Sequence, residues 1–294
     1  ALQEDLPATL RELHKFYPLR GPCLDALARA FAGCDLVLCD IAPAGIPAAR
    51  RCGSRSVLLE NFTWDWIYRQ YSASCPELAA VSGELARLFA GADHHIQARP
   101  FCGPVTGDLV TGPVARRIRS PAADVRRRLG ISPRQRMVLL SLGGAGFRNI
   151  RLGLPDDGRT VFVTAAAGAE IAEGEHIRLL QGDGEFFHPD LVAASDAVVG
   201  KVGYSTIAEV YRAGVPFGYI GRHGFPESGP LEAFIKREMA GVEIEESDLA
   251  AGRLGDRLLE LCDKPVPSRR HPDGAHQCGL FLSSLLAGHS GGRS

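Results

Sequence analysis

Five residues in the second half of the 294-residue sequence have types and spacing that suit phosphate chemistry. Lys201 ends an apolar run, Gly203 follows it, and Ser205 and Thr206 precede Glu209. A strand, a glycine turn and a helix capped by Ser205 or Thr206 direct backbone N–H groups, hydroxyls and an ammonium toward one point, as a diphosphate requires. Glu209 lies four residues beyond Ser205 on the same helix face, within reach of an attached ribose. Taken alone, the pattern leaves nucleotide binding and plain packing equally open.

The elements that must position these residues alternate between strands and helices. Short apolar runs typical of buried parallel strands lie at 35–39, 56–59, 94–97, 137–142, 160–164, 177–180, 197–200 and 217–220. Helical segments lie at 6–16, 23–32, 44–52, 76–90, 122–129, 190–194, 205–213, 230–239, 246–262 and 278–286. The alternation predicts an α/β protein with open, mostly parallel sheets. Ligands of such sheets bind at the carboxyl ends of the strands, so we expect the site in a cleft there.

The length of 294 residues suggests about two domains. Residues 111–136 contain Gly-Pro and Ser-Pro pairs and two arginine clusters, which mark a connection. We therefore assign 1–110 to a first unit, 111–136 to a linker and 137–294 to a second unit. The linker arginines suit a solvated surface better than nucleic acid, because 33 Lys and Arg balance 34 Asp and Glu and no aromatic residues are interleaved.

Composition excludes several classes of protein. A hydrophobic content of 45% and a charged content of 23% are ordinary for a folded globular chain. No apolar run approaches a membrane span and no signal-peptide core begins the chain, so we expect a cytoplasmic protein. The eight cysteines form no C-x-x-C pair, which favours free thiols. His271, His276 and Cys278 come nearest to a metal-ligand set, but they lead into an apolar helix and we expect no metal there.

The complete sequence pattern of the second unit identifies a protein family more specifically than the glycine turn alone. Gly203-Tyr-Ser-Thr-x-x-Glu209, then Ala213-Gly-Val-Pro216 and an acidic residue about ten positions on, resembles the sugar-nucleotide motif of GT-B glycosyltransferases. Similar forms occur in the peptidoglycan N-acetylglucosaminyl transferase, in UDP-glycosyltransferases and in the amino-terminal domains of sugar-kinase fusions. The resemblance implies two Rossmann-like domains facing a cleft. It also implies inverting transfer of a hexose from a nucleotide-sugar, expected to be UDP-linked, with no metal or cofactor required.

The resemblance also assigns roles to residues. It implies that the donor diphosphate is bound by Gly143 and Gly144 of Ser141-Leu-Gly-Gly144 and by Lys201, Gly203, Ser205 and Thr206. Glu209 matches the residue that holds the ribose hydroxyls. Glu227 matches the acidic residue that binds the donor hexose. The next residue is usually Gln but is Ser228 here, which departs from the family pattern at the hexose position.

In the first unit, Asp40 follows an apolar run and resembles the aspartate that orients the catalytic histidine of UDP-glycosyltransferases. A helix cap or a loop hydrogen bond is the alternative for such an aspartate. The family's histidine lies in a Gly-His-Gly loop that does not occur in this sequence, and neither His14 nor the His94-His95 pair matches it. We therefore expect the chain to begin partway into the family's first domain and to bind substrate without turnover by itself.

Several alternatives stay open at this stage. Phe186 and Phe187 precede the donor helix near the expected base, but core packing is favoured for both. The aromatic segment Phe62–Tyr68 suits either stacking on an acceptor or a packed lid. The acceptor is an unidentified small molecule, lipid or glycan, which leaves peripheral membrane contact open. The main alternative to a glycosyltransferase is a catalytically silent nucleotide-sugar-binding or regulatory domain, followed by an epimerase or hydrolase.

Overall fold

The computed structural model describes residues 4–142, 154, 156–164, 176–180, 184–222, 224–245, 247–248, 253 and 255–287. Two compact units divide the described chain. Residues 4–114 and 271–287 form the first unit, and residues 115–270 form the second unit. No described helix is long and apolar enough to cross a membrane.

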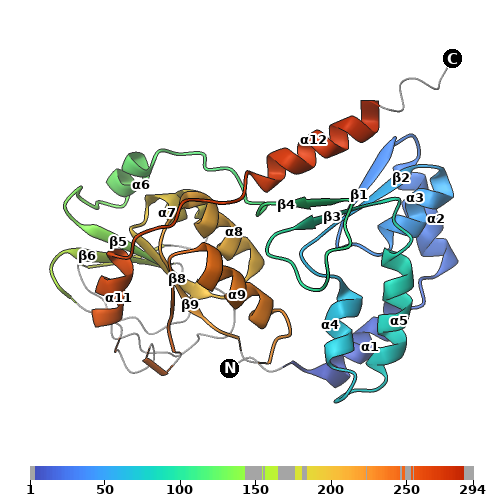
Figure 1. Ribbon diagram of the computed structural model, residues 1–294, viewed down its shortest axis with the longest axis horizontal. Coiled ribbons are helices and arrows are strands. Elements are labelled where there is room, and N and C mark those ends of the chain that lie inside the picture. The colour runs from blue at the N-terminus through green and yellow to red at the C-terminus, as the bar shows by residue number, and fades with distance from the viewer. Residues whose placement is uncertain are drawn as a thin grey trace. The chain divides into compact units, whose positions relative to one another are not determined.

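The first unit contains a four-stranded parallel sheet in the order β1-β2-β3-β4 (Figure 1). Its strands are β1 (Leu36–Asp40), β2 (Arg55–Glu60), β3 (His94–Ala98) and β4 (Leu109–Thr111). Its helices are α1 (Leu6–Phe16), α2 (Gly21–Phe31), α3 (Gly45–Cys52), α4 (Trp64–Gln70), α5 (Leu78–Phe89) and α12 (Gly274–Ala287). Helices α3, α4 and α5 lie in the crossovers that join β1, β2 and β3, because a parallel pair needs a crossover, whereas residues 99–108 join β3 to β4 without a helix.

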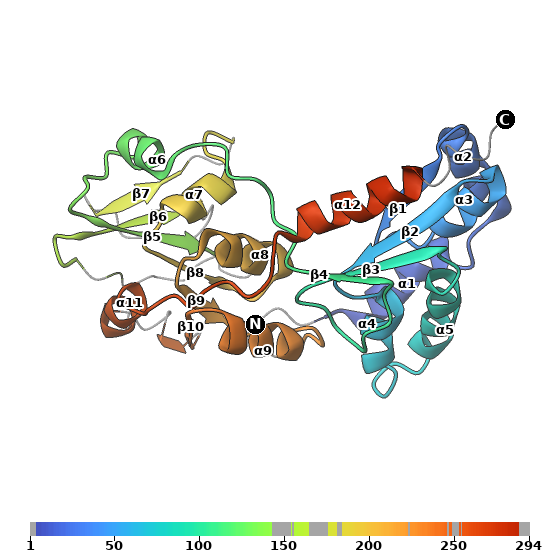
Figure 2. The same cartoon turned by 45° about the horizontal axis from the view of Figure 1, so that its top comes forward.

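Side chains alternate between the two faces of this sheet, and each face has its own helices. Cys39 and Leu58 pack with Ile46 of α3 and Leu85 of α5 on one face. On the other face, Val57 and Ile96 pack with Cys278, Phe281 and Leu282 of α12. The last helix of the described chain therefore returns to the first sheet (Figures 1 and 2). The sequence division into 1–110, 111–136 and 137–294 stays a prediction. In the structure the first unit also includes the described residues from 271 onward, because α12 packs on the first sheet.

The second unit contains a six-stranded parallel sheet in the order β10-β9-β8-β5-β6-β7. Its strands are β5 (Arg136–Ser141), β6 (Thr160–Thr164), β7 (Ile177–Leu179), β8 (Ala197–Lys201), β9 (Phe217–Ile220) and β10 (Gly241–Glu243). Its helices are α6 (Ala122–Arg128), α7 (His188–Ala194), α8 (Tyr204–Ala213), α9 (Ser228–Glu238) and α11 (Gly255–Cys262). The strand order reverses between β5 and β8, which makes that junction the switch point where doubly wound sheets bind ligands.

Helices cover both faces of the second sheet (Figure 2). Leu139 and Val198 face a cluster that includes residues of α6, α7, α8 and α9, whereas Leu140 and Val199 face α11. A strand buried on both faces reads as a continuous apolar run, which is why the period of two was hidden in the sequence. The predicted strands of both sheets are present, together with two short strands, β4 and β10, that no apolar run indicated.

We predict that Gly218→Ala destabilises the second unit by about 1–3 kcal/mol, because an added methyl group overpacks the core. A Cβ at Gly218 would lie 2.5 Å from Cδ1 of Ile244 and 3.0 Å from Cδ2 of Leu261. Gly229→Ala is the matched control, since no atom lies within 4 Å of its added Cβ. Urea denaturation measures both changes. Equal stabilities for the two variants would contradict the packing argument.

Candidate functional site

The switch point of the second sheet brings together the residues predicted to meet a diphosphate. Ser141 ends β5 and Lys201 ends β8, and Ser141 pairs in register with Gly200 of β8. Helix α8 begins just beyond Lys201, so its amino terminus lies at the same sheet edge. Gly143 and Gly144, which complete the predicted phosphate loop, lie outside the described residues.

The cap of α8 differs from the one expected. Gly203 is the cap residue, in extended backbone conformation, and Ser205 and Thr206 lie inside the first turn. No described side chain caps this helix. The prediction that Ser205 or Thr206 caps the helix is therefore wrong, because the helix begins at Tyr204, before either hydroxyl residue. A first turn without a side-chain cap presents N–H groups that an anionic ligand is suited to accept.

Glu209 is the buried carboxylate around which the site is organised, with 3% of its side chain exposed. Its Oε1 accepts a hydrogen bond from Nε of Arg116 at 2.7 Å. Its Oε2 lies 2.6 Å from Nδ1 of His188, and Nε2 of the same ring lies 2.9 Å from Oγ of Ser141. The four side chains form one hydrogen-bonded chain that joins β5, α7, α8 and the segment before α6. Nδ1 of His188 is placed to donate to the carboxylate, and the Ser141 hydroxyl is hydrogen-bonded to the other ring nitrogen.

The charge state of Glu209 follows from these contacts. Burial alone would raise the pKa of Glu209, but the hydrogen bonds and charges of His188 and Arg116 outweigh burial and hold its pKa below the ordinary value. The carboxylate is therefore ionised at neutral pH, in the state that accepts hydrogen bonds from ribose hydroxyls.

Arginines of the predicted linker form one side of this site. The Arg116 and Arg119 guanidinium groups lie 5.0 Å and 3.8 Å from the ring centroid of Phe187. The backbone N–H of Arg119 donates to Oδ1 of the buried Asp190 at 2.6 Å. Arg116 and Arg119 are exposed, as expected for a solvated linker face, and they also contact a buried carboxylate and an aromatic ring. Phe186 packs against the core as favoured, whereas Phe187 lies under the two cations.

Glu227 and Ser228 follow β9 at the same carboxyl edge of the sheet. Ser228 is buried at the start of α9 and its Oγ donates to the carbonyl oxygen of Arg222 at 2.8 Å. Oε1 of Glu227 lies 3.6 Å from Nη1 of Arg222. Both side chains are therefore engaged with the loop after β9 in this structure. Their predicted contact with a hexose stays a prediction.

Asp40 ends β1 in the first unit and is exposed. Its backbone pairs with Leu59 of β2, and its side chain makes no hydrogen bond or ion pair with any residue that the structure describes. Ile41, directly after it, has a φ of 50°, which is a strained conformation for a β-branched residue. Strain of this kind is often stored at functional turns, but the base-orienting role of Asp40 stays a prediction.

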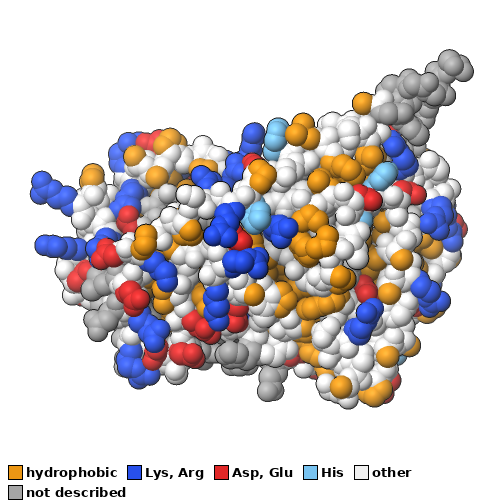
Figure 3. Space-filling model, viewed as in Figure 1, with side chains coloured by type: hydrophobic (Ala, Val, Ile, Leu, Met, Phe, Trp, Pro, Cys, Tyr) orange, Lys and Arg blue, Asp and Glu red, His pale blue; other side chains and the backbone are white. Residues whose placement is uncertain are grey.

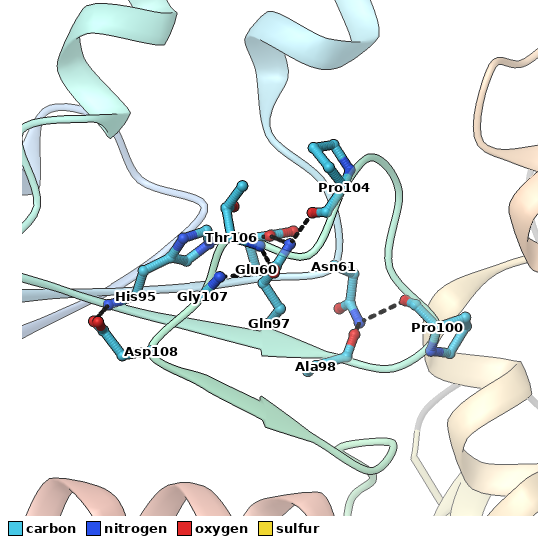
Figure 4. Close-up of polar contacts among 10 residues, drawn as sticks. All are labelled: Glu60, Asn61, His95, Gln97, Ala98, Pro100, Pro104, Thr106, Gly107 and Asp108. Carbon is cyan, nitrogen blue, oxygen red and sulfur yellow. Dashed lines mark hydrogen bonds and ion pairs between the residues drawn. The ribbon is translucent and has the colours of Figure 1, made fainter.

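A second polar cluster, in the first unit, was not foreseen (Figure 4). Glu60 ends β2 with 3% of its side chain exposed, and its Oε1 accepts from Nε2 of Gln97 at 2.9 Å and lies 3.1 Å from Nε2 of His95. Oε1 of Gln97 accepts the backbone N–H groups of Thr106 and Gly107. The cluster thus ties the loop between β3 and β4 to the sheet and orients the His95 ring.

The aromatic segment forms α4 and the residues before it. The Trp64 and Tyr68 rings stack at 5.8 Å, and Phe62 meets Trp64 edge-on at 5.0 Å. Trp64 is 37% exposed, while Ile67 is buried beneath the helix. An exposed aromatic surface therefore remains beside the packed one, so acceptor stacking stays open. Within the described ranges, no three His, Cys, Asp or Glu side chains are grouped as a metal ion would require.

The two parallel α/β units have the GT-B glycosyltransferase fold. UGT89C1 of Arabidopsis thaliana, solved with quercetin, matches with a TM-score of 0.61 at 13% identity, over 96% of this chain and 80% of that one. The glycosyltransferase VinC, solved with dTDP, matches with a TM-score of 0.59 at 17% identity, over 98% and 84%. MurG of Acinetobacter baumannii matches with a TM-score of 0.55 at 17% identity, over 90% and 80%. These matches confirm the predicted α/β class and the predicted GT-B fold.

Among curated proteins, L-arabinokinase of Arabidopsis thaliana is 30% identical to this chain over 224 residues. The match covers 74% of this chain and 21% of the kinase, so the chain spans about a fifth of the length of the curated relative it matches. No protein-family model matches the chain.

Sequence reasoning missed His188 and Arg116 as partners of Glu209. His188 lies just before the predicted helix 190–194, but nothing in the pattern paired its ring with a carboxylate 21 residues away. Arg116 is separated from Glu209 by 93 residues, and no local pattern reports such a contact.

We predict that Glu209→Gln lowers the free energy of unfolding at pH 7 by about 1–3 kcal/mol, the usual effect of losing hydrogen bonds to a buried charge. Because the folded pKa is depressed, the carboxylate stabilises the fold fully above its unfolded pKa of about 4.3. That contribution is lost as pH falls through the folded pKa, so the gap between wild type and variant closes in acid. Urea denaturation between pH 7 and pH 2.5 measures the gap. Glu260→Gln, on an exposed position of α11, serves as control, and a gap that widens in acid would refute the assignment.

Proposed function

We propose that this chain binds a nucleotide-sugar at the carboxyl edge of the second sheet and takes part in transferring its hexose to an acceptor. The observation that carries the proposal is the buried, ionised Glu209 beside the uncapped amino terminus of α8. A carboxylate and a helix terminus at a switch point match the two chemical parts of a nucleoside diphosphate, its ribose diol and its phosphates. The solved complex of VinC with dTDP, which shares the fold, supports a nucleotide as ligand.

The diphosphate would lie at the first turn of α8. The N–H groups of that turn and the hydroxyls of Ser205 and Thr206 would donate to its oxygens, and Lys201 would supply a positive charge. These groups would stabilise the negative charge that develops on the diphosphate as the bond to the sugar breaks. Transfer would then proceed by positioning and electrostatics, with UDP as the expected nucleotide and inversion as the expected outcome.

The ribose would meet Glu209 from the side now occupied by Arg116. The Arg116 side chain is 55% exposed, whereas His188 holds the other carboxylate oxygen from within the unit. A ribose hydroxyl could replace the Arg116 Nε at Oε1 without disturbing the His188 contact. Arg116 would then be released toward solvent or toward the phosphates.

We predict that UDP raises the melting temperature of the protein and that Glu209→Ala weakens UDP binding by about tenfold or more, the usual loss for hydrogen bonds to a charged group. Titration calorimetry with UDP measures the affinity, and uridine in place of UDP separates the diphosphate contribution. Glu260→Ala is the control for a general effect of removing a carboxylate. If no nucleoside diphosphate binds the wild-type protein, the proposed site is refuted.

A second candidate is a catalytically silent nucleotide-sugar-binding or regulatory module. The match with L-arabinokinase favours it, because the aligned region is about a fifth of that much longer protein. The two candidates share the donor site and differ only in chemistry.

Turnover separates the two candidates, because a transferase releases the hexose by transfer or slow donor hydrolysis in the presence of UDP-hexose, whereas a silent module does neither. NMR of the donor anomeric proton follows release of the sugar over hours, and Lys201→Met should slow the release by lowering the charge at the diphosphate. A donor that binds with unchanged NMR signals over the same period, in the presence of candidate acceptors, would favour the silent module.

A further inference from the structure

A separate cavity lies in the second unit at the amino ends of β5 and β8, on the edge of the sheet opposite the candidate donor site. Its volume is about 900 Å³, and residues at the end of α6 and in the segment 130–136 form most of its wall. This volume is ample for a small-molecule ligand, and sites of that size commonly combine apolar walls with a few placed polar groups. Every residue that lines the cavity belongs to the second unit.

Arg126 holds the wall of this cavity in place. Its guanidinium donates to the carbonyl oxygen of Ala194 at 2.9 Å and to that of Gln135, and it pairs with Asp196 at 3.1 Å. Oδ2 of Asp196 also accepts the backbone N–H of Met137 at 2.7 Å. The segment 130–136 is thereby tied to the first residues of β5 and to the residue before β8. These contacts fix the position of the cavity wall.

The charge on the cavity wall is mainly positive. Among the described residues, Arg126, Arg127, Arg134 and Arg136 line it together with the carboxylate of Asp196. Arg127 and Arg136 pair with Asp124 and Asp263 at 2.7 Å and 2.8 Å. Both are exposed pairs, which contribute little and yield readily to a ligand. Arg134 makes no ion pair with a described residue, and basic side chains are visible over α6 and the adjoining edge of the unit (Figure 3).

The remaining wall is apolar. Ala123, Ile131 and Pro133 contribute to it, and none of the described residues that line the cavity is aromatic. Guanidinium groups favour phosphate oxygens through paired hydrogen bonds, while the aliphatic surface suits a less polar group on the same ligand. Single-stranded nucleic acid is disfavoured, because its binding sites usually offer aromatic stacking platforms.

We propose that this cavity, called the α6 pocket, binds a small phosphorylated ligand that carries two or more phosphate charges and a heterocyclic or apolar group, such as a nucleoside polyphosphate. The α6 pocket is distinct from the donor site and does not rest on the proposed transferase function. Arg127, Arg134 and Arg136 supply the phosphate contacts, and Arg126 positions the wall. Two arginines of the second cluster, Arg126 and Arg127, thus belong to the proposed binding site.

The test is titration calorimetry with ATP as probe. Wild-type protein is expected to bind ATP, and Arg127→Ala/Arg134→Ala is expected to weaken that binding by about tenfold or more, the loss typical of charged hydrogen bonds. Glu209→Gln is expected to weaken at most the ATP bound at the donor site and to leave a second binding event, which the arginine variants remove. Tripolyphosphate should bind more weakly than ATP, because it lacks a group for the apolar wall.

Matched variants keep the outcome decisive. Arg11→Ala/Arg87→Ala removes the same charge from exposed helices of the first unit and should not change ATP affinity. The single variant Arg134→Glu provides a second measurement if the double variant is unstable. The proposal is overturned if wild-type protein does not bind ATP, if the arginine variants bind it as well as wild type, if Glu209→Gln abolishes all binding, or if a single-stranded oligonucleotide binds more tightly than ATP.

Discussion

A buried carboxylate requires partners, and in this protein that requirement organises the ligand edge of the second sheet. Glu209 is ionised within the unit, and a charge removed from water is tolerated only when it is paired and hydrogen-bonded. Two partners come from separate elements, His188 from α7 and Arg116 from the segment before α6, and Ser141 of β5 extends the chain of contacts. The carboxylate thus holds four parts of the chain in one arrangement.

The α/β class and the strands of both sheets were predictable from sequence because they depend on local signals. Apolar runs of strand length and helical segments between them define a parallel sheet whatever its ligand. The helix after Lys201 was predicted to within one residue, yet its cap was not, because Gly203 places the helix start before either hydroxyl residue. Boundaries of this kind depend on backbone conformation that neighbouring elements impose.

The partners of the candidate site could not be predicted, because they are long-range. Arg116 looked like a surface residue in an arginine-rich stretch, and only the folded chain places it against Glu209. Helix α12 is a comparable case. Its sequence predicted an apolar helix, but nothing in it indicated that Cys278 and Phe281 pack on Val57 and Ile96, far away in the chain. Apolar periodicity shows that a face is buried without showing what covers it.

The pairing of Arg116 with Glu209 has a consequence for any ligand that reaches this carboxylate. Such a ligand competes with a side chain that is tethered to the same unit and therefore present at high effective concentration. A ligand must therefore form a hydrogen bond to the carboxylate that is strong enough to displace Arg116. The Arg116 guanidinium thus competes with weak ligands for Glu209. Binding of a stronger ligand would move Arg116, in the segment that follows β4, away from Phe187.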